Sequence, residues 1–319
     1  MKKLFFLLIA IAVSFSQTGT IVMAQDQKDQ IRIDHGVNPY EQPDGVMRFT
    51  PSGKIKAALT TGGTGNLSAL VDHGGPVINT PTIYLIWYGN WNQNNGSDTP
   101  AGQQLIRDWA NGIGGTPHFA LNKSYSSAKP ISGSVFYGGQ TTDTGTRTSL
   151  SDTQIRTVVN NAITSGRLPY NANGVYFVVT ASNVTASSGF CTQYCGWHTV
   201  GTLTNGKVRY SFVGNAKRCI SSCAAQSTSP NNNAGVDGAI SVMTHELEEA
   251  TTDPDLNAWY DSSGAENGDK CAWTFGHTQL QATNGSWYNM TFGGHQWLIQ
   301  RNVFRSGSSW LCMVDSTHN

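Results

Sequence analysis

Charge is scarce in this 319-residue chain, and neither sign of charge predominates. Charged residues make up 13% of the sequence, and 20 basic side chains balance 20 acidic ones. A chain without a basic excess has no electrostatic basis for binding nucleic acid or an anionic membrane. The composition therefore argues against a nucleic-acid partner.

Long hydrophobic runs are also few. The longest, Leu4–Val13, follows two lysines and is too short to cross a bilayer, a pattern typical of a signal peptide. Small residues at Val22–Ala24 offer a cleavage site. We therefore expect a signal peptide over residues 1–24, export to the extracellular space or the periplasm, and no transmembrane segment.

Common catalytic signatures are missing as well. The sequence has no G-x-S-x-G elbow, no phosphate-cradling glycine loop after a strand, and no internal repeat. Its 6 cysteines all lie in the C-terminal half. In an oxidising compartment an even set of cysteines forms disulfides, which leaves no thiol for nucleophilic catalysis.

The sequence does not fix how the cysteines pair, because six cysteines allow 15 connectivities. Our hypothesis is two local bridges within C-x-x-x-C segments, Cys191–Cys195 and Cys219–Cys223, and one long-range bridge, Cys271–Cys312. The same segments could instead supply zinc thiolates, although structural zinc sites are usual in reducing compartments. We expect a C-terminal half held together by disulfides.

The domain organisation follows from local composition. Residues 25–75 have no sustained hydrophobic period and include the Gly- and Thr-rich tract 60–65, so we expect a flexible N-terminal segment there. A single folded domain is expected over residues 76–319.

Clear strand and helix signals alternate in this domain. Thr82–Tyr88 and Gly174–Thr180 are continuous apolar runs typical of buried strands. Thr99-Pro100 and the capping box at Ser151–Gln154 each open a helix between them. Further signals are an Asn205-Gly206 hairpin, a hairpin over 287–303 with Gly293-Gly294 at its turn, and a last strand at 310–314. The order predicts an α/β (α+β) fold with a mixed central sheet and flanking helices.

One histidine and four acids lie within the nine residues His245–Asp253 of the stretch Val242–Pro254, at the end of a helix expected over 236–252. His245 and Glu249 are four residues apart, so they project from one face of that helix. With Glu246 they form H-E-x-x-E, the metalloprotease helix H-E-x-x-H with its second histidine replaced. The apolar stripe that includes Met243 and Leu247 predicts that one side packs on the sheet while the other faces a cleft.

This spacing predicts a zincin-like active helix. His245 and Glu249 would be zinc ligands, and Glu246 the general base. The candidates for the third ligand are Glu266, which is preferred with Asp269 behind it, and then Asp255, His198, Asp253 and Asp269, with His277 and His295 weaker.

Other interpretations of these residues stay open. Acids four residues apart are common on a solvated helix face. The acidic loop after the helix could bind calcium through the carboxylates of Asp253, Asp255, Asp261, Glu266 and Asp269, or bind no ion at all. Exposed aromatics near Trp87 and Trp91 could bind glycan.

Several ordered segments resemble the EXORDIUM / phosphate-induced protein family. They are His73–Pro76, Ile83–Trp91, Phe190–His198, Phe212–Asn215, His245–Pro254, Asn257–Tyr260, Glu266–Cys271 and Leu311–Cys312. The resemblance implies an extracellular or cell-wall-associated protein with a zincin-like helix. The chain departs from plant members at Asp253, where those tend to carry asparagine.

Two functions follow as hypotheses. The first is a secreted, zinc-dependent, metallopeptidase-like hydrolase that acts on a peptide. The second is a non-catalytic extracellular or cell-wall-associated protein with a structural calcium ion or a glycan-binding role.

Overall fold

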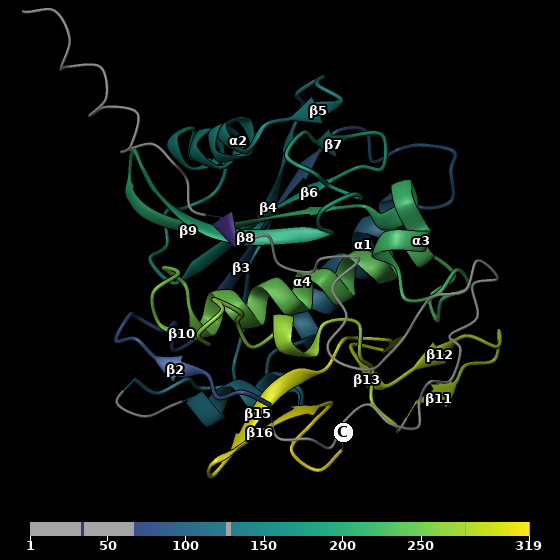
Figure 1. The fold of residues 1–319 in the computed structure, drawn as a ribbon. Helices are drawn as coiled ribbons and strands as arrows, with labels where there is room; N and C mark the ends of the chain where they lie inside the picture. The colour runs from purple at the N-terminus through teal and green to yellow at the C-terminus, as the bar shows by residue number, and fades with distance from the viewer. Residues whose placement is uncertain (1–32, 35–66, 126–128, 278, 319) are drawn as a thin grey trace, which may run out of the picture. The chain divides into compact units, whose positions relative to one another are not determined.

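A six-stranded mixed sheet organises the computed structural model (Figure 1). Its strands, in spatial order, are β1 (Ile33–Asp34), β8 (Gly196–Leu203), β9 (Gly206–Gly214), β6 (Gly174–Thr180), β3 (Thr82–Tyr88) and β4 (Phe136–Asp143). β9, β6, β3 and β4 run parallel, whereas β8 is antiparallel to both of its neighbours. The predicted α/β fold with a mixed central sheet is confirmed.

The structure describes residues 67–125, 129–277 and 279–318, together with the backbone of 33–34. The expected signal peptide and most of the expected flexible segment 25–75 lie outside these residues. Strand β2 (Val71–Asp72) pairs with β10 (Trp259–Tyr260), so the described fold includes residues that precede the expected domain start at 76. None of the described helices is long and apolar enough to cross a membrane.

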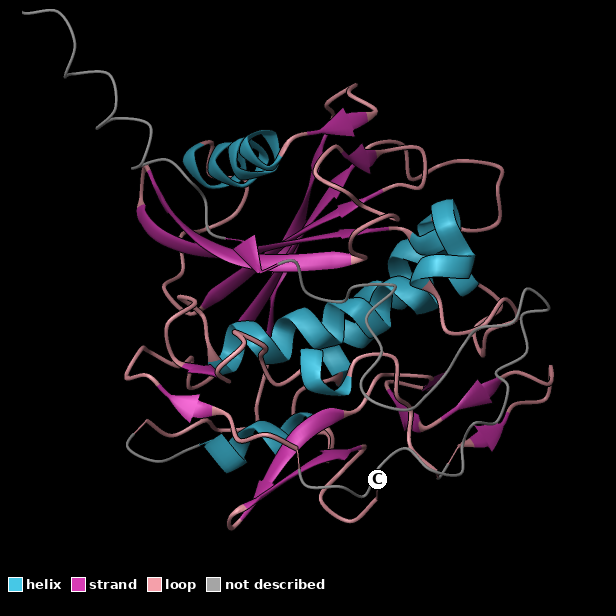
Figure 2. Cartoon of the chain, viewed as in Figure 1, coloured by secondary structure: helices cyan, strands magenta, loops and turns pink. Residues whose placement is uncertain are grey.

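The strands and helices of the parallel core form where local signals are strongest. Every residue of β6 is buried, as expected for an apolar strand covered on both faces. Helix α1 (Pro100–Gly112) begins after Thr99, whose side chain accepts from the backbone N–H of Gly102. Helix α2 (Asp152–Thr164) has the predicted capping box at Ser151. Figure 2 shows α2 on one side of the sheet and the longest helix on the other.

That longest helix is α4 (Ala234–Thr252), and it packs against β8, β9 and β6. All of its residues after Ala234 are buried, so its second side does not face a cleft and that expectation was wrong. The segment after the helix covers this side, because Thr252 donates to Asn267 and the backbone of Gln300 donates to Ser241. A helix packed on both sides carries apolar residues around most of its circumference.

Short elements complete the described chain. The short helices are η1 (Phe119–Tyr125), η2 (Ala216–Cys219), α3 (Ile220–Cys223) and η3 (Asp269–Cys271). The two-stranded pairs are β5 (Ser149–Leu150) with β7 (Thr185–Ala186), β11 (Leu280–Gln281) with β12 (Trp287–Tyr288), β13 (Met290–Phe292) with β14 (His295–Trp297), and β15 (Asn302–Ser306) with β16 (Ser309–Met313). The hairpin that turns at Gly293-Gly294 is thus shorter than predicted.

Three disulfides staple the C-terminal half, as expected, but two of the predicted pairings were wrong. Cys191 pairs with Cys219 and Cys195 with Cys223, each over 28 residues, while Cys271–Cys312 pairs as predicted. The two C-x-x-x-C segments lie side by side, so each cysteine faces one in the other segment. These cysteines therefore hold no zinc as thiolates in this structure.

The aromatic residues considered for glycan binding are not exposed. Trp87 lies on β3 with 2% of its surface accessible, and Trp91 is 6% accessible. Their rings pack edge to face in the core, 5.1 Å apart. The expectation of exposed aromatics at this position was wrong.

Candidate metal centre

The positions of the polar residues along helix α4 decide what each of them contacts. Asn233 caps its N-terminus by accepting from the backbone N–H of Val236. The H-E-x-x-E residues then fall in the last two turns, against the sheet strand β8. His198 projects toward them from β8, and the loop through η3 brings Glu266 and Asp269 over the same region.

A first group of donors gathers around His245. Its Nε2 lies 2.9 Å from Oε1 of Glu249 and 3.6 Å from Oδ1 of Asp269. One donor atom from each of these three residues lies within 4.8 Å of the other two. The backbone N–H of Asp269 donates to the same Oε1 of Glu249 at 3.0 Å, which fixes the loop against the helix.

A second group shares Glu249 and uses its other oxygen. Nδ1 of His198 lies 3.4 Å from Oε2 of Glu246 and 3.5 Å from Oε2 of Glu249. These three residues also offer donor atoms within 4.8 Å of one another. Glu249 thus stands between an imidazole on its own helix and an imidazole on the sheet.

Glu266 lies behind His198 rather than beside His245. Its Oε2 is 3.7 Å from Nε2 of His198, on the ring edge opposite Glu246. A carboxylate in this position is common next to a metal-ligating histidine, because it orients the ring. The structure therefore brings Asp269, and not the preferred Glu266, to the side of His245.

These groups are buried and mutually close without being hydrogen bonded. His198, Glu246 and Glu249 are 0% accessible, and His245 is 2% accessible. Both ring nitrogens of His198 and His245, both oxygens of Glu246, and Oε2 of Glu249 have no hydrogen-bond partner among the described residues. The short nitrogen–oxygen distances lack hydrogen-bond geometry, as expected of donor atoms that face a shared point.

The pKa values show how strongly these groups act on one another. Burial alone would lower the pKa of His245 and His198, but the neighbouring carboxylates outweigh it and hold both well above 6.5. Burial would raise the pKa of Glu249, but the two histidines lower it to about 2. Burial, with the charge of Glu249, raises the pKa of Glu246 to about 7. The site strongly favours positive charge among its carboxylates.

Two glycines leave the space around these donors clear. A Cβ atom on Gly268 would lie 2.8 Å from both Oε1 of Glu249 and Nδ1 of His245. A Cβ atom on Gly196 would lie 3.2 Å from Oε1 of Glu246 and 2.5 Å from Val242. Any larger residue at Gly268 would displace the donors. This glycine, in the Asn267-Gly268 turn, has a role that the sequence analysis missed.

The chemistry of the donors fits a divalent transition metal. Zinc takes imidazole nitrogen and carboxylate oxygen at about 2.0–2.2 Å, usually from three protein ligands when a fourth position stays open. His245, Glu249 and Asp269 supply that set, and the buried ring nitrogens of His245, which have no hydrogen-bond partner among the described residues, fit metal coordination. Asp269 is the outermost donor, with 17% of its side chain accessible.

The remaining candidate ligands lie elsewhere. The carboxylate of Asp255 pairs with Lys207 and Arg209, and Asp261 pairs with Lys270. Asp253 ends α4, where its Oδ1 accepts from two backbone N–H groups. His295 pairs with Asp108, and His277 is exposed. Three of the five acids proposed for calcium are thus engaged away from Glu266 and Asp269.

A buried ion pair next to the site had no sequence signal that we recognised. Nε2 of His118 lies 3.1 Å from Oε1 of Glu248, and its Nδ1 lies 2.7 Å from the carbonyl of Val314. Both side chains are almost fully buried. Glu248 therefore faces away from the donors and ties α4 to the C-terminal segment.

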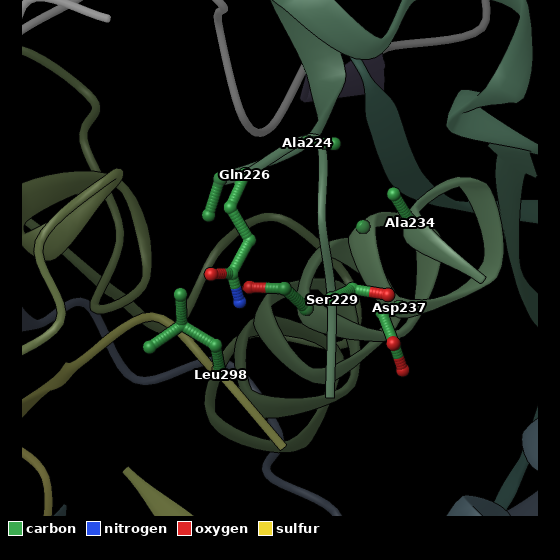
Figure 3. A pocket seen from close by; sticks show the side chains of 9 residues that line it. Ala224, Gln226, Ser229, Ala234, Asp237 and Leu298 are labelled. Carbon is green, nitrogen blue, oxygen red and sulfur yellow. The ribbon is translucent and has the colours of Figure 1, made fainter. Parts of the chain in front are cut away.

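A small cavity lies at the other end of α4 (Figure 3). Gln226, Ser229, Asp237 and Leu298 are among the residues that line it. Asp237 precedes His245 by eight residues, about 12 Å along the helix axis. A volume of about 10 Å³ holds one water molecule at most, so this cavity is not a substrate site.

Fold and site together define a disulfide-stapled α/β protein with its H-E-x-x-E helix buried against the sheet. The model of the phosphate-induced protein 1 conserved region matches residues 70–297, and the chain belongs to this family. That match contains β3, β8, α4 and the whole donor cluster.

Two curated relatives support the same assignment. Protein EXORDIUM-like 3 of Arabidopsis thaliana is 31% identical over 281 residues, covering 75% of this chain and 81% of the relative. Protein EXORDIUM-like 5 of the same plant is 29% identical over 309 residues, covering 83% and 81%. A search of the solved structures gave no significant match. The resemblance stated from the sequence motifs is confirmed.

Proposed function

We propose that this protein is an exported, metal-dependent hydrolase of the phosphate-induced protein family, with zinc as its first candidate metal. The ligands in this proposal are His245, Glu249 and Asp269. One observation carries it: His245, Glu249 and Asp269 offer an imidazole nitrogen and two carboxylate oxygens within 4.8 Å of one another, and neither buried ring nitrogen of His245 has a hydrogen-bond partner among the described residues. Such groups are costly to bury unless a cation compensates them.

The residues of the site have separate roles in this proposal. His245, Glu249 and Asp269 hold the ion, which when bound would polarise a carbonyl and make water a stronger acid. Glu246 is the general base, because it follows a ligand directly and both of its oxygens lack hydrogen-bond partners among the described residues. Asp269 lies at the outer edge, which makes its side the route by which a peptide carbonyl would enter.

A non-catalytic protein with a structural ion is the second candidate. The burial of His245, Glu246 and Glu249 favours it, because closed sites are typical of structural metals. Removal and replacement of the metal ion distinguishes a catalytic ion from a structural one. A catalytic ion should be removed by a chelator and restored with the protein folded, whereas removal of a structural ion should unfold the chain.

Metal analysis of the purified, exported protein tests the proposal. We expect zinc in the wild type, loss of the His245-bound ion in His245→Ala and Glu249→Gln, and retention of that ion in Glu246→Gln with any hydrolysis abolished. Glu248→Gln is the matched control, since Glu248 is an equally buried glutamate on the same helix that faces His118 instead. Wild-type protein without any transition metal would refute the proposal.

A further inference from the structure

The carboxylate of Glu249 faces two separate groups of donors with its two oxygens. Oε1 lies 2.9 Å from His245 on its own helix, on the side where Asp269 closes the site. Oε2 lies 3.5 Å from Nδ1 of His198, on the side of Glu246. A carboxylate placed in this way can bind one ion through each oxygen.

We propose that the site binds two divalent metal ions bridged by Glu249, the second ion being held by His198, Glu246 and Glu249. This proposal rests on the proposed function, which needs only the ion at His245. The second group repeats the donor chemistry of the first, with one imidazole and two carboxylates.

The orphaned atoms of this second group point to a ligand rather than to structural hydrogen bonding. His198 and Glu246 are 0% accessible, and neither side chain has a hydrogen-bond partner among the described residues. Both aim at one point, since Nδ1 of His198 lies within 3.5 Å of an oxygen from each of Glu246 and Glu249. Within the described residues, histidines are the only ion-pair partners of Glu246 and Glu249.

The surroundings of His198 complete the arrangement. Glu266 faces its Nε2 at 3.7 Å, so it can hold the ring with Nδ1 directed at the ion. Glu246 would bind through Oε2, which leaves Oε1 as the acceptor for a proton. Two-metal hydrolytic sites place their ions about 3.5–4 Å apart and commonly share a carboxylate between them.

Charge favours two ions over one. Metal-bound imidazoles must be neutral, so His198 and His245 would contribute no positive charge. The carboxylates of Glu246, Glu249, Asp269 and the adjoining Glu266 then carry four formal negative charges, of which a single divalent ion compensates only two. A second divalent ion compensates the other two.

Counting bound zinc by native mass spectrometry tests the proposal. Metal-free protein titrated with Zn²⁺ should bind two ions per chain, and Asp269→Asn and His198→Gln should each bind one. Glu249→Gln should lose both, and it also gives the baseline for zinc bound elsewhere on the surface. Glu248→Gln, the matched control, should bind two.

The outcomes separate this inference from the proposed function. One ion in the wild type, abolished by Asp269→Asn and retained in His198→Gln, overturns the second ion and leaves the first. No ion in the wild type overturns both. Two ions in His198→Gln, or the loss of only one in Glu249→Gln, also overturns the bridged site. If His198→Gln loses its near-ultraviolet circular dichroism, Glu246→Gln replaces it with the same expected count.

Discussion

Glu248 and Glu249 are adjacent in the sequence and equally buried, yet they have unrelated surroundings. Glu248 pairs with His118, whereas Glu249 stands between His245 and His198. Successive residues of a helix differ by about 100° in direction, which separates the two carboxylates. Adjacent carboxylates in the last turns of α4 therefore have different partners and different roles.

Asp255 gives a residue-scale prediction. Its carboxylate lies 2.8 Å from Lys207 and from Arg209, away from the donors. Asp255→Asn should lower the free energy of unfolding by about 1 kcal/mol at pH 7 and leave the zinc content unchanged. Denaturant unfolding and metal analysis measure these two effects, and loss of zinc in this variant would mean that the donors are assigned incorrectly.

The stability effect of Asp255→Asn should depend on pH. Burial alone would raise the pKa of Asp255, but Arg209 and Lys207 outweigh it and hold the pKa below its usual value of 3.8. A lowered pKa means that the ionised carboxylate stabilises the fold above pH 3.8, and that this contribution is lost as the pH falls through the folded-state value. The variant and the wild type should therefore converge in stability once the pH falls below the folded-state pKa of Asp255.

At the scale of elements, the sequence predicted the strands and helix starts that depend on neighbouring residues alone. β3, β6 and the starts of α1 and α2 lie where apolar runs and capping residues placed them. The donor cluster was predictable only in its H-E-x-x-E part. Asp269 reaches His245 because its backbone bonds to Glu249 across 20 residues, and no periodicity in the sequence encodes that contact.

The prediction of the cysteine pairing was wrong for the same reason, and the pairing in the structure can be tested directly. Tryptic peptides 168–207 and 219–270 carry two cysteines each. The structure predicts that they remain joined until reduction, because both bridges cross between them. Mass spectrometry of a non-reduced digest should show the two peptides joined as one species. Two separate peptides, each with an internal disulfide, would instead support the local bridges and contradict the structure.

The whole molecule combines a sheet, a helix against it, and a disulfide-linked cover over that helix. Cys271–Cys312 fixes the end of the chain next to η3, so the loop that carries Asp269 is anchored close to α4. Disulfides of this kind agree with an exported protein. The family match covers strands β3, β4, β6, β8 and β9 of the sheet, the helix and this loop together, so we expect the donor cluster to work as a property of the complete domain.

Anomalous diffraction at the zinc absorption edge, from crystals of the purified exported protein, tests the central claim most directly. The account predicts a peak about 2.0–2.2 Å from Nε2 of His245 and from oxygens of Glu249 and Asp269. A map without a peak between these residues, or with its strongest peak at Asp255 or Asp261, would contradict it.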